Sequence, residues 1–113
     1  MFRKALLAAM IGAISLAHAA DWSAETLATA RLFPHGVPLS SQKSYLGHTL
    51  GACGVLESWF AIEMMRDGLF MPTLNLNHPD ERCGAVDFIR GTARPIATDH
   101  VMNNNFAFGG VNT

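Results

Sequence analysis

The spacing of apolar and polar positions along the chain predicts helices and short strands. Residues 23–33 have the pattern of a short helix, which Ser23 can cap and Pro34 can end. Residues 37–40 predict an extended segment. Its strand should begin near Pro38, because a proline fits poorly inside a central strand.

The longest predicted helix covers residues 48–66, and Gly68 lies just past its end as a stop signal. Apolar side chains cover nearly every direction around it, and only Glu57, Glu63 and Arg66 interrupt them. A helix that is apolar all round belongs in a large interior, so we expect more protein around it than a small globule provides. The two glutamates argue against a membrane span.

Shorter extended segments follow this helix. Residues 69–77 are predicted to be extended, with Pro72 among them, and residues 86–89 predict a strand. Residues 101–108 predict a further strand that runs into two glycines. After residue 21 the sequence contains no internal repeat, low-complexity tract or linker. At this length it holds one small domain or a part of a larger one.

The first twenty residues differ from the rest and predict a signal-peptide-like segment, residues 1–20. Arg3 and Lys4 give a positive start, residues 5–17 are apolar or small, and Ala-His-Ala at 17–19 resembles a cleavage site. The apolar run is about thirteen residues, shorter than the roughly twenty needed to cross a bilayer. The same residues could instead form an apolar helix or a buried strand of a cytoplasmic protein.

Composition excludes several functional classes. The chain has 113 residues, is 50% hydrophobic and only 15% charged, and carries a formal net charge of −1. A disordered polar tail would be poorer in apolar residues, and a nucleic-acid binder that works through bulk positive charge would need a basic excess. Cys53 and Cys83 lie in no motif with zinc spacing, so we expect no metal and no cofactor.

Lys43 and His48 lie five residues apart in a glycine-rich segment, where Gly47, Gly51 and Gly54 allow close backbone approach. At a helix N-terminus the unpaired N–H groups disfavour imidazolium, so His48 should be neutral there. A neutral imidazole can donate an N–H to a developing oxyanion, provided that Lys43 or a backbone group fixes its tautomer. On its own, such a pair is more often structural than catalytic.

The wider pattern favours catalysis. The string SSxKSxxGHTLGAxG at 40–54 is followed by PTLNL at 72–76 and by NNFAFGGVNT at 104–113. Together these motifs resemble the C-terminal part of β-ketoacyl-ACP synthases, and they look closest to the branch that includes aryl-polyene ketosynthases. The resemblance covers about 25–113. It implies an α/β fold, the C-terminal half of a thiolase-like layered α-β-α arrangement, without the N-terminal half and the last strand. The domain would be residues 22–113.

The resemblance also implies an activity. Members of the family carry out a decarboxylative Claisen condensation of acyl-ACP with malonyl-ACP in fatty-acid or polyketide synthesis, so acyl carrier protein would be the partner. His48 matches the second of two histidines that stabilise the enolate. Lys43 matches a lysine that organises the site, with Glu25 and Glu57 as its expected charge partners. The reaction creates negative charge on oxygen, which suits groups that donate hydrogen bonds.

The end of the chain matches the gating loop of the family. Phe108 corresponds to the gating phenylalanine, whose backbone N–H helps to form the thioester oxyanion hole. Gly109 and Gly110 would give that loop its freedom of movement. Asn103 to Asn105 could cap or hydrogen-bond within the strand. The isolated histidines are expected in surface loops: His35, His78 and His100.

Two catalytic groups of the family have no counterpart here: the nucleophilic cysteine and the first histidine. Cys53 and Cys83 match neither, and Cys53 is expected to be a small buried side chain. We therefore predict no condensing activity for the isolated chain, because losing the nucleophile removes the covalent route. We also predict poor solubility or a molten state, or else assembly with an N-terminal half or dimer partner.

Two functions remain open from the sequence. The first is a fragment of a cytoplasmic β-ketoacyl-ACP synthase. The alternative is a non-catalytic exported or partner-binding protein that reuses this fragment, which would require the signal-like segment 1–20 to be genuine. Acyl-ACP substrates are intracellular, which favours the first.

Overall fold

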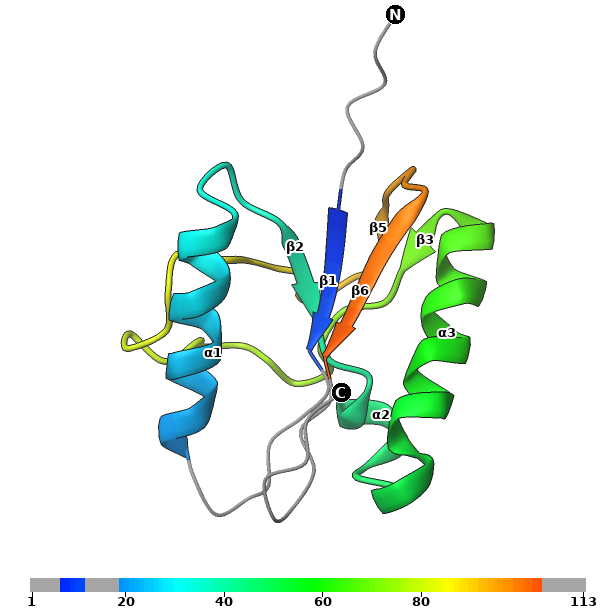
Figure 1. The fold of residues 1–113 in the computed structure, drawn as a ribbon, viewed down its shortest axis with the longest axis horizontal. Helices are drawn as coiled ribbons and strands as arrows, with labels where there is room; N and C mark the ends of the chain where they lie inside the picture. The colour runs from blue at the N-terminus through cyan, green and yellow to red at the C-terminus, as the bar shows by residue number, and fades with distance from the viewer. Residues whose placement is uncertain (1–6, 12–18, 105–113) are drawn as a thin grey trace, which may run out of the picture.

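A sheet of four parallel strands lies at the centre of the fold, which the computed structural model describes for residues 7–11 and 19–104 (Figure 1). Its strand order is β4-β2-β1-β6, and a separate antiparallel pair joins β3 to β5. The elements are, in order, β1 (Leu7–Ile11), α1 (Ala19–Leu32), β2 (Pro38–Ser40), α2 (Lys43–Leu46), a 3₁₀ turn (Leu50–Ala52), α3 (Cys53–Asp67), β3 (Leu69–Phe70), β4 (Asp87–Phe88), β5 (Arg94–Pro95) and β6 (His100–Asn104).

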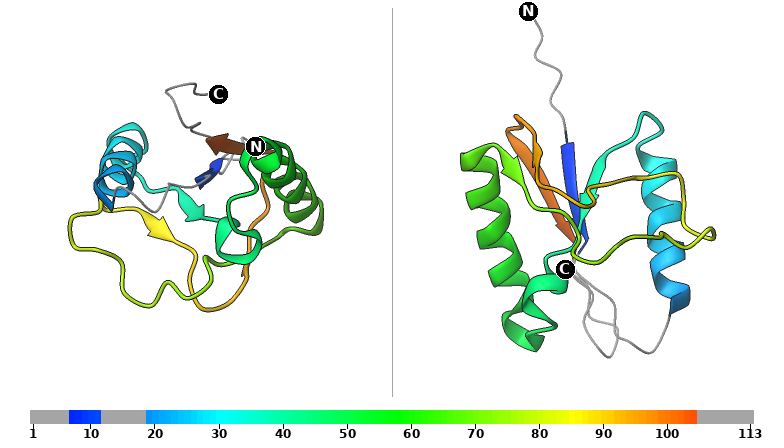
Figure 2. Two further views of the ribbon diagram at one scale, coloured as in Figure 1. Left: turned by 90° about the horizontal axis from the view of Figure 1, so that it is seen from below. Right: turned by 180° about the vertical axis from the view of Figure 1, so that it is seen from behind.

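Helices cover both faces of this sheet. Helix α1 lies on one side of the strands and α3 on the other, and the views in Figure 2 agree on this arrangement. Parallel strands need such helices, because each connection must cross from one end of the sheet to the other. The described residues therefore form three layers, α-β-α.

Strand β1 comes from the apolar segment at the start of the chain and lies inside the sheet. It pairs in parallel with β2, where Ala9 lies opposite Leu39, and with β6, where Leu7 lies opposite His100. An interior parallel strand is buried on both faces and is therefore apolar throughout. Within segment 1–20 the structure describes residues 7–11, which form this strand, an alternative that the sequence left open, and residues 19–20, which begin α1.

Helix α1 and strand β2 occur where the sequence predicted them, with one difference. Helix α1 begins before the predicted start, so Ser23 lies inside it, and the prediction that Ser23 caps the helix is wrong. The helix ends as predicted. Phe33 still donates its N–H to Thr29 O at 2.9 Å, but Pro34, the next residue, has no N–H to continue the pattern. Strand β2 begins at Pro38 itself.

Helix α3 ends as predicted and starts later than predicted. Gly68 adopts the left-handed conformation (φ 64°) and donates its N–H to Met64 O, which closes the helix. At the other end Leu50 has a φ of 52°, a conformation that no α-helix contains. The α-helix therefore cannot extend back through Leu50; a 3₁₀ turn, Leu50–Ala52, comes first, and α3 begins at Cys53.

The second half of the described chain is less regular than its pattern suggested. Only Leu69–Phe70 of the predicted segment 69–77 is a strand. Strand β4 and strand β6 confirm the predicted strands at 86–89 and 101–108, but β6 begins one residue earlier and residues 105–108 lie outside the described residues. The one-turn helix α2 and the short strand β5 were not predicted.

Two hydrophobic clusters form the core, one on each side of the sheet. The cluster beside α3 contains Ala61, Met64, Phe70, Ile89 and Ile96. The smaller cluster contains Val37 and Leu39, with Phe33 and Phe88 packed against it.

The buried residues of α3 fall on one stripe, and its other faces remain open to solvent. Buried positions recur at intervals of three or four residues: Cys53, Glu57, Ala61 and Met64. On the opposite side Val55, Trp59 and Ile62 are 74%, 59% and 50% exposed. Within the described residues, only one side of this all-round apolar helix is therefore packed against other parts of the chain. Among these residues no helix is long and apolar enough to span a membrane.

Candidate active site

Lys43 lies at the start of α2, just beyond the carboxyl end of β2, and forms a buried ion pair. Its Nζ lies 2.5 Å from Glu57 Oε1 on α3, and the two side chains are only 12% and 3% exposed. Burial strengthens the attraction between two opposite charges but costs each of them its hydration. Such a pair holds both side chains in one geometry, because either charge left alone in this place would be costly.

Glu25 lies on α1, and Lys43 acts on it through its charge rather than through a hydrogen bond. Both of its carboxyl oxygens are buried without a hydrogen-bond partner. Burial raises the pKa of Glu25 from its ordinary value of 4.5 to about 7, and the nearby charge of Lys43 lowers it by a smaller amount. Of the two expected charge partners, Glu57 is thus the one that Lys43 contacts, whereas Lys43 acts on Glu25 only through its charge.

His48 follows α2 in an exposed turn. Gly47, the residue before it, has a φ of 71°, which reverses the chain after the single helical turn. The Nδ1 atom of His48 accepts the backbone N–H of Leu50 at 2.9 Å. In the neutral ring the proton is therefore on Nε2, because Nδ1 acts as the acceptor. A backbone group fixes the tautomer, and the ring can donate through Nε2.

Two sequence motifs that lie about thirty residues apart are joined by hydrogen bonds at α2. Thr73 Oγ1 accepts the backbone N–H of Ser41 at 2.9 Å. Ser44 Oγ donates to Ser41 O and accepts the N–H of Leu74, both at 2.9 Å. The hydroxyls of the two motifs thus tie α2 to the loop at 73–74. We call this group of three hydrogen bonds the hydroxyl clasp.

The loop that carries Thr73 is itself fixed to the sheet. Thr73 donates its backbone N–H to Ile89 O at 3.0 Å, and Ile89 donates to Leu39 O on β2 at 2.8 Å. Ile89 and Leu39 are each 1% exposed. Sequence reasoning did not identify Ser44 or Thr73 as functional, although both lie in the quoted motifs. The missing information is spatial, since no spacing rule indicates that a hydroxyl in one motif reaches the backbone of the other.

Cys53 and Asn103 border the site from α3 and β6. The Cys53 thiol is buried and donates to Glu57 Oε1 at 3.6 Å, in keeping with the expected small buried side chain. Asn103 Nδ2 donates to Gly54 O at 3.3 Å and to Ser58 Oγ at 2.9 Å, so this asparagine joins β6 to the first turn of α3. It serves the packing of a strand on a helix.

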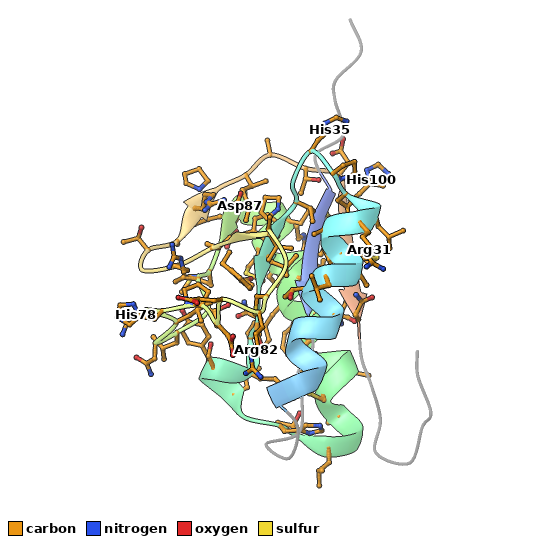
Figure 3. All side chains as sticks on the ribbon, turned by 90° about the vertical axis from the view of Figure 1, so that its left-hand side faces the viewer. Arg31, His35, His78, Arg82, Asp87 and His100 are labelled. Atoms are coloured by element: carbon orange, nitrogen blue, oxygen red, sulfur yellow. The ribbon has the colours of Figure 1, made fainter. Side chains whose placement is uncertain are left out.

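Some of the remaining candidate residues lie within the described part of the chain, and others do not. Phe108, Gly109 and Gly110 lie outside the described residues. His35, His78 and His100 are exposed, and Figure 3 shows His78 on a loop well apart from His35. Cys83 is partly buried and forms no disulfide. Across residues 7–11 and 19–104, no three histidine, cysteine or acidic side chains gather as a metal site would require.

The described geometry suits the stabilisation of negative charge. An imidazole whose Nδ1 accepts a hydrogen bond can donate one through Nε2 to an oxyanion, and the Lys43–Glu57 pair holds the side chain of Lys43 at the start of α2. Neither cysteine lies beside a base that would activate it: the acceptor of the Cys53 thiol is Glu57, which already binds Lys43. Among the described residues, the site can bind and polarise but supplies no evident nucleophile.

Comparisons with known proteins agree on one family. The family model for the β-ketoacyl synthase C-terminal domain matches residues 10–77, more than half of the chain. A 3-oxoacyl-[acyl-carrier-protein] synthase 2 from Coxiella burnetii is 47% identical over 74 residues, which are 66% of this chain and 18% of the relative. A putative mitochondrial 3-oxoacyl-[acyl-carrier-protein] synthase from Schizosaccharomyces pombe is 33% identical over 96 residues, 79% of this chain and 22% of the relative.

A solved structure gives the same result for the fold. The crystal structure of a β-ketoacyl synthase from Burkholderia phymatum superimposes with a TM-score of 0.84 at 50% sequence identity, covering 95% of this chain and 26% of that one. The chain therefore spans about a fifth of the length of the curated relatives and about a quarter of the solved structure.

Proposed function

Since the chain belongs to the β-ketoacyl synthase family, matching its C-terminal domain as the sequence resemblance predicted, we propose that it supplies part of the active site of a 3-oxoacyl-ACP synthase. The reaction would be the decarboxylative condensation of acyl-ACP with malonyl-ACP. The observation that carries the proposal is the turn at His48, where the backbone N–H of Leu50 fixes the imidazole tautomer, five residues after Lys43 and its buried pair with Glu57.

In this proposal His48 is the group that touches the reacting atoms. When malonyl-ACP loses CO2, the electrons of the broken C–C bond form an enolate whose oxygen carries the negative charge. The Nε2–H of His48 donates a hydrogen bond to that oxygen and stabilises the transition state that leads to it. One such donor typically contributes about 10²–10³ in rate. Lys43 and Glu57 act as positioning residues for the turn.

Other groups of the reaction would come from outside the described residues. Phe108, Gly109 and Gly110 are proposed to form the gating loop that the resemblance implies. The acyl-carrying cysteine and the first histidine would belong to the remainder of a synthase, and acyl carrier protein would deliver both thioesters. The exposed apolar residues Val55 and Trp59 on α3 support such a remainder, because a synthase of four times this length has surface to cover them.

We propose residues 22–113 as the synthase domain, extended at its start to include β1. The interior position of Leu7–Ile11 in the sheet and a family match that begins at residue 10 support counting this strand with the domain. Use of acyl carrier protein would place the activity inside the cell, and an exported protein that only reuses the fragment is not favoured.

A chimeric synthase tests the function. Residues 10–77 replace the matching segment of the Coxiella burnetii synthase, and the rate of condensation of acyl-ACP with malonyl-ACP is measured. We expect the chimera to be active and His48→Ala to lower its rate about 10²–10³-fold. His35→Ala is the matched control, since His35 is an exposed histidine in a loop. An H48A chimera with the rate of the H35A chimera would refute the role of His48.

The chain alone provides a second test. We expect no condensation and no acyl-enzyme after incubation with acyl-ACP, measured by intact mass, because neither Cys53 nor Cys83 has an activating base. An acyl group found on either cysteine would contradict this.

A further inference from the structure

Helix α2 carries the chain from Lys43 toward His48 but has no hydrophobic anchor of its own. It is one turn long, and none of its four residues is buried. A helix this short is not stable by its own hydrogen bonds. Its position must therefore come from the polar contacts that it makes with the rest of the domain.

Those contacts are the hydroxyl clasp and the ion pair of Lys43. The ion pair holds α2 only through the long flexible side chain of Lys43, which makes it a looser constraint than a bond to the backbone. The clasp acts on the backbone itself: Ser44 Oγ bonds to Ser41 O and to the N–H of Leu74, and Thr73 Oγ1 holds the N–H of Ser41. Serine and threonine side chains are short, so these hydrogen bonds allow the backbone of α2 little movement.

We propose that Ser44 and Thr73 are positioning residues for His48, acting through the hydroxyl clasp that fixes α2 and the turn after it. The proposal rests on the proposed role of His48 as the oxyanion donor. The turn passes from α2 through Gly47, whose N–H is bound to Lys43 O at 2.8 Å, to His48 and the Leu50 N–H that sets its tautomer. Loss of the clasp would release the backbone of the turn that carries both His48 and Leu50, and the hydrogen bond between them would no longer be held.

Amide hydrogen exchange of the full 113-residue chain tests the clasp directly. The amides of Tyr45, Leu46 and Gly47 are bonded within α2 and report its opening, while those of Ala61 and Met64 in α3 report the stability of the whole domain. In Ser44→Ala and in Thr73→Val we expect exchange at the α2 amides to become about five- to tenfold faster, with the α3 amides unchanged within about twofold.

The tautomer of His48 is the readout that a purely structural role would not change. In the wild-type chain, the nitrogen-15 spectrum of His48 should show the Nε2–H form. In Ser44→Ala the Nδ1–H form should appear beside it, because Nδ1 loses its donor from Leu50. Thr73→Ser keeps the hydroxyl and should restore both the exchange rates and the spectrum.

Ser58→Ala provides a matched control. Ser58 Oγ also donates to a backbone carbonyl, Gly54 O at 2.7 Å, and also accepts from an amide, Asn103 Nδ2 at 2.9 Å, but it lies on α3. We expect S58A to leave the α2 amides and the His48 tautomer as in the wild type. Equal effects of S58A and S44A on the α2 amides would overturn the proposal.

Other results would also overturn it. These are unchanged α2 exchange and tautomer in both clasp variants, a uniform rise of exchange across α2 and α3, or wild-type α2 amides that exchange like an unstructured peptide. After any of these results, the condensation rate of the H48A chimera would still decide the role of His48. Conversely, an H48A chimera as fast as the H35A chimera would refute the proposed function, while the exchange data would still test the clasp.

Discussion

The ion pair between Lys43 and Glu57 allows a quantitative prediction. Lys43→Met removes the cation and leaves a carboxylate whose side chain is 3% exposed without its partner. Breaking a buried pair in this way typically lowers the free energy of unfolding by about 3–5 kcal/mol. For a domain of this size, a loss of about 3 kcal/mol corresponds to a Tm lower by roughly 12 °C.

The assay is urea unfolding of the 113-residue chain at low protein concentration, followed by circular dichroism. Arg66→Met is the matched control, since Arg66 pairs with Glu63 at 3.2 Å with side chains that are 70% and 45% exposed. An exposed pair contributes at most about 1 kcal/mol. The double variant Lys43→Met/Glu57→Leu should recover most of the loss, because replacing both members of a buried pair by apolar residues is often neutral.

Two results would contradict the prediction for this pair. A loss in Lys43→Met no larger than in Arg66→Met, or a double variant as unstable as the single one, would refute the argument that burial makes this pair matter.

Three further predictions follow from other residues. The pKa of Glu25 is about 7 in the fold, against an ordinary value of 4.5. Between these two pH values, the folded chain keeps a proton on Glu25 that the unfolded chain has lost. Stability should therefore fall as the pH rises from 4.5 to 7, and Glu25→Gln should remove this fall in urea midpoints; parallel profiles of variant and wild type would contradict it. Gly84→Ala should destabilise the chain by about 1–3 kcal/mol, because its Cβ would lie 2.5 Å from a backbone carbonyl oxygen of α1. Gly51→Ala, whose Cβ would meet nothing within 4 Å, is the control, and equal unfolding curves would disprove the clash. Replacing Val55 and Trp59 together by serine should lower self-association in sedimentation measurements, because both expose apolar surface on α3; an unchanged distribution would show that this face does not associate.

The sequence predicted best where local chemistry decides the structure. Gly68 ends α3 because a left-handed residue is needed there, and Pro38 begins β2 because a proline fits the first position of a strand. The start of α3 was placed too early. Leu50 adopts a left-handed conformation that its residue type does not suggest, and the helical apolar pattern continues through it.

Strand β1 and the hydroxyl clasp show what a linear pattern leaves open. A run of small and apolar residues suits an interior parallel strand as well as a signal segment, since neither has a polar face. The motif around Lys43 and His48 was identified through its resemblance to a family. Its attachment to Thr73 depends on long-range contacts, which one sequence does not record.

The position of β1 also bears on how the chain acquires its structure. Ala9 lies opposite Leu39, thirty residues on, whereas Leu7 lies opposite His100, ninety-three residues on. Closing the longer loop costs about 1 kcal/mol more entropy than closing the shorter one. On the ribosome, β1 can meet β2 early but must wait for nearly all of the described chain before β6 emerges. Until then one edge of an apolar strand stays unpaired, and such an edge is where two unfinished chains can associate.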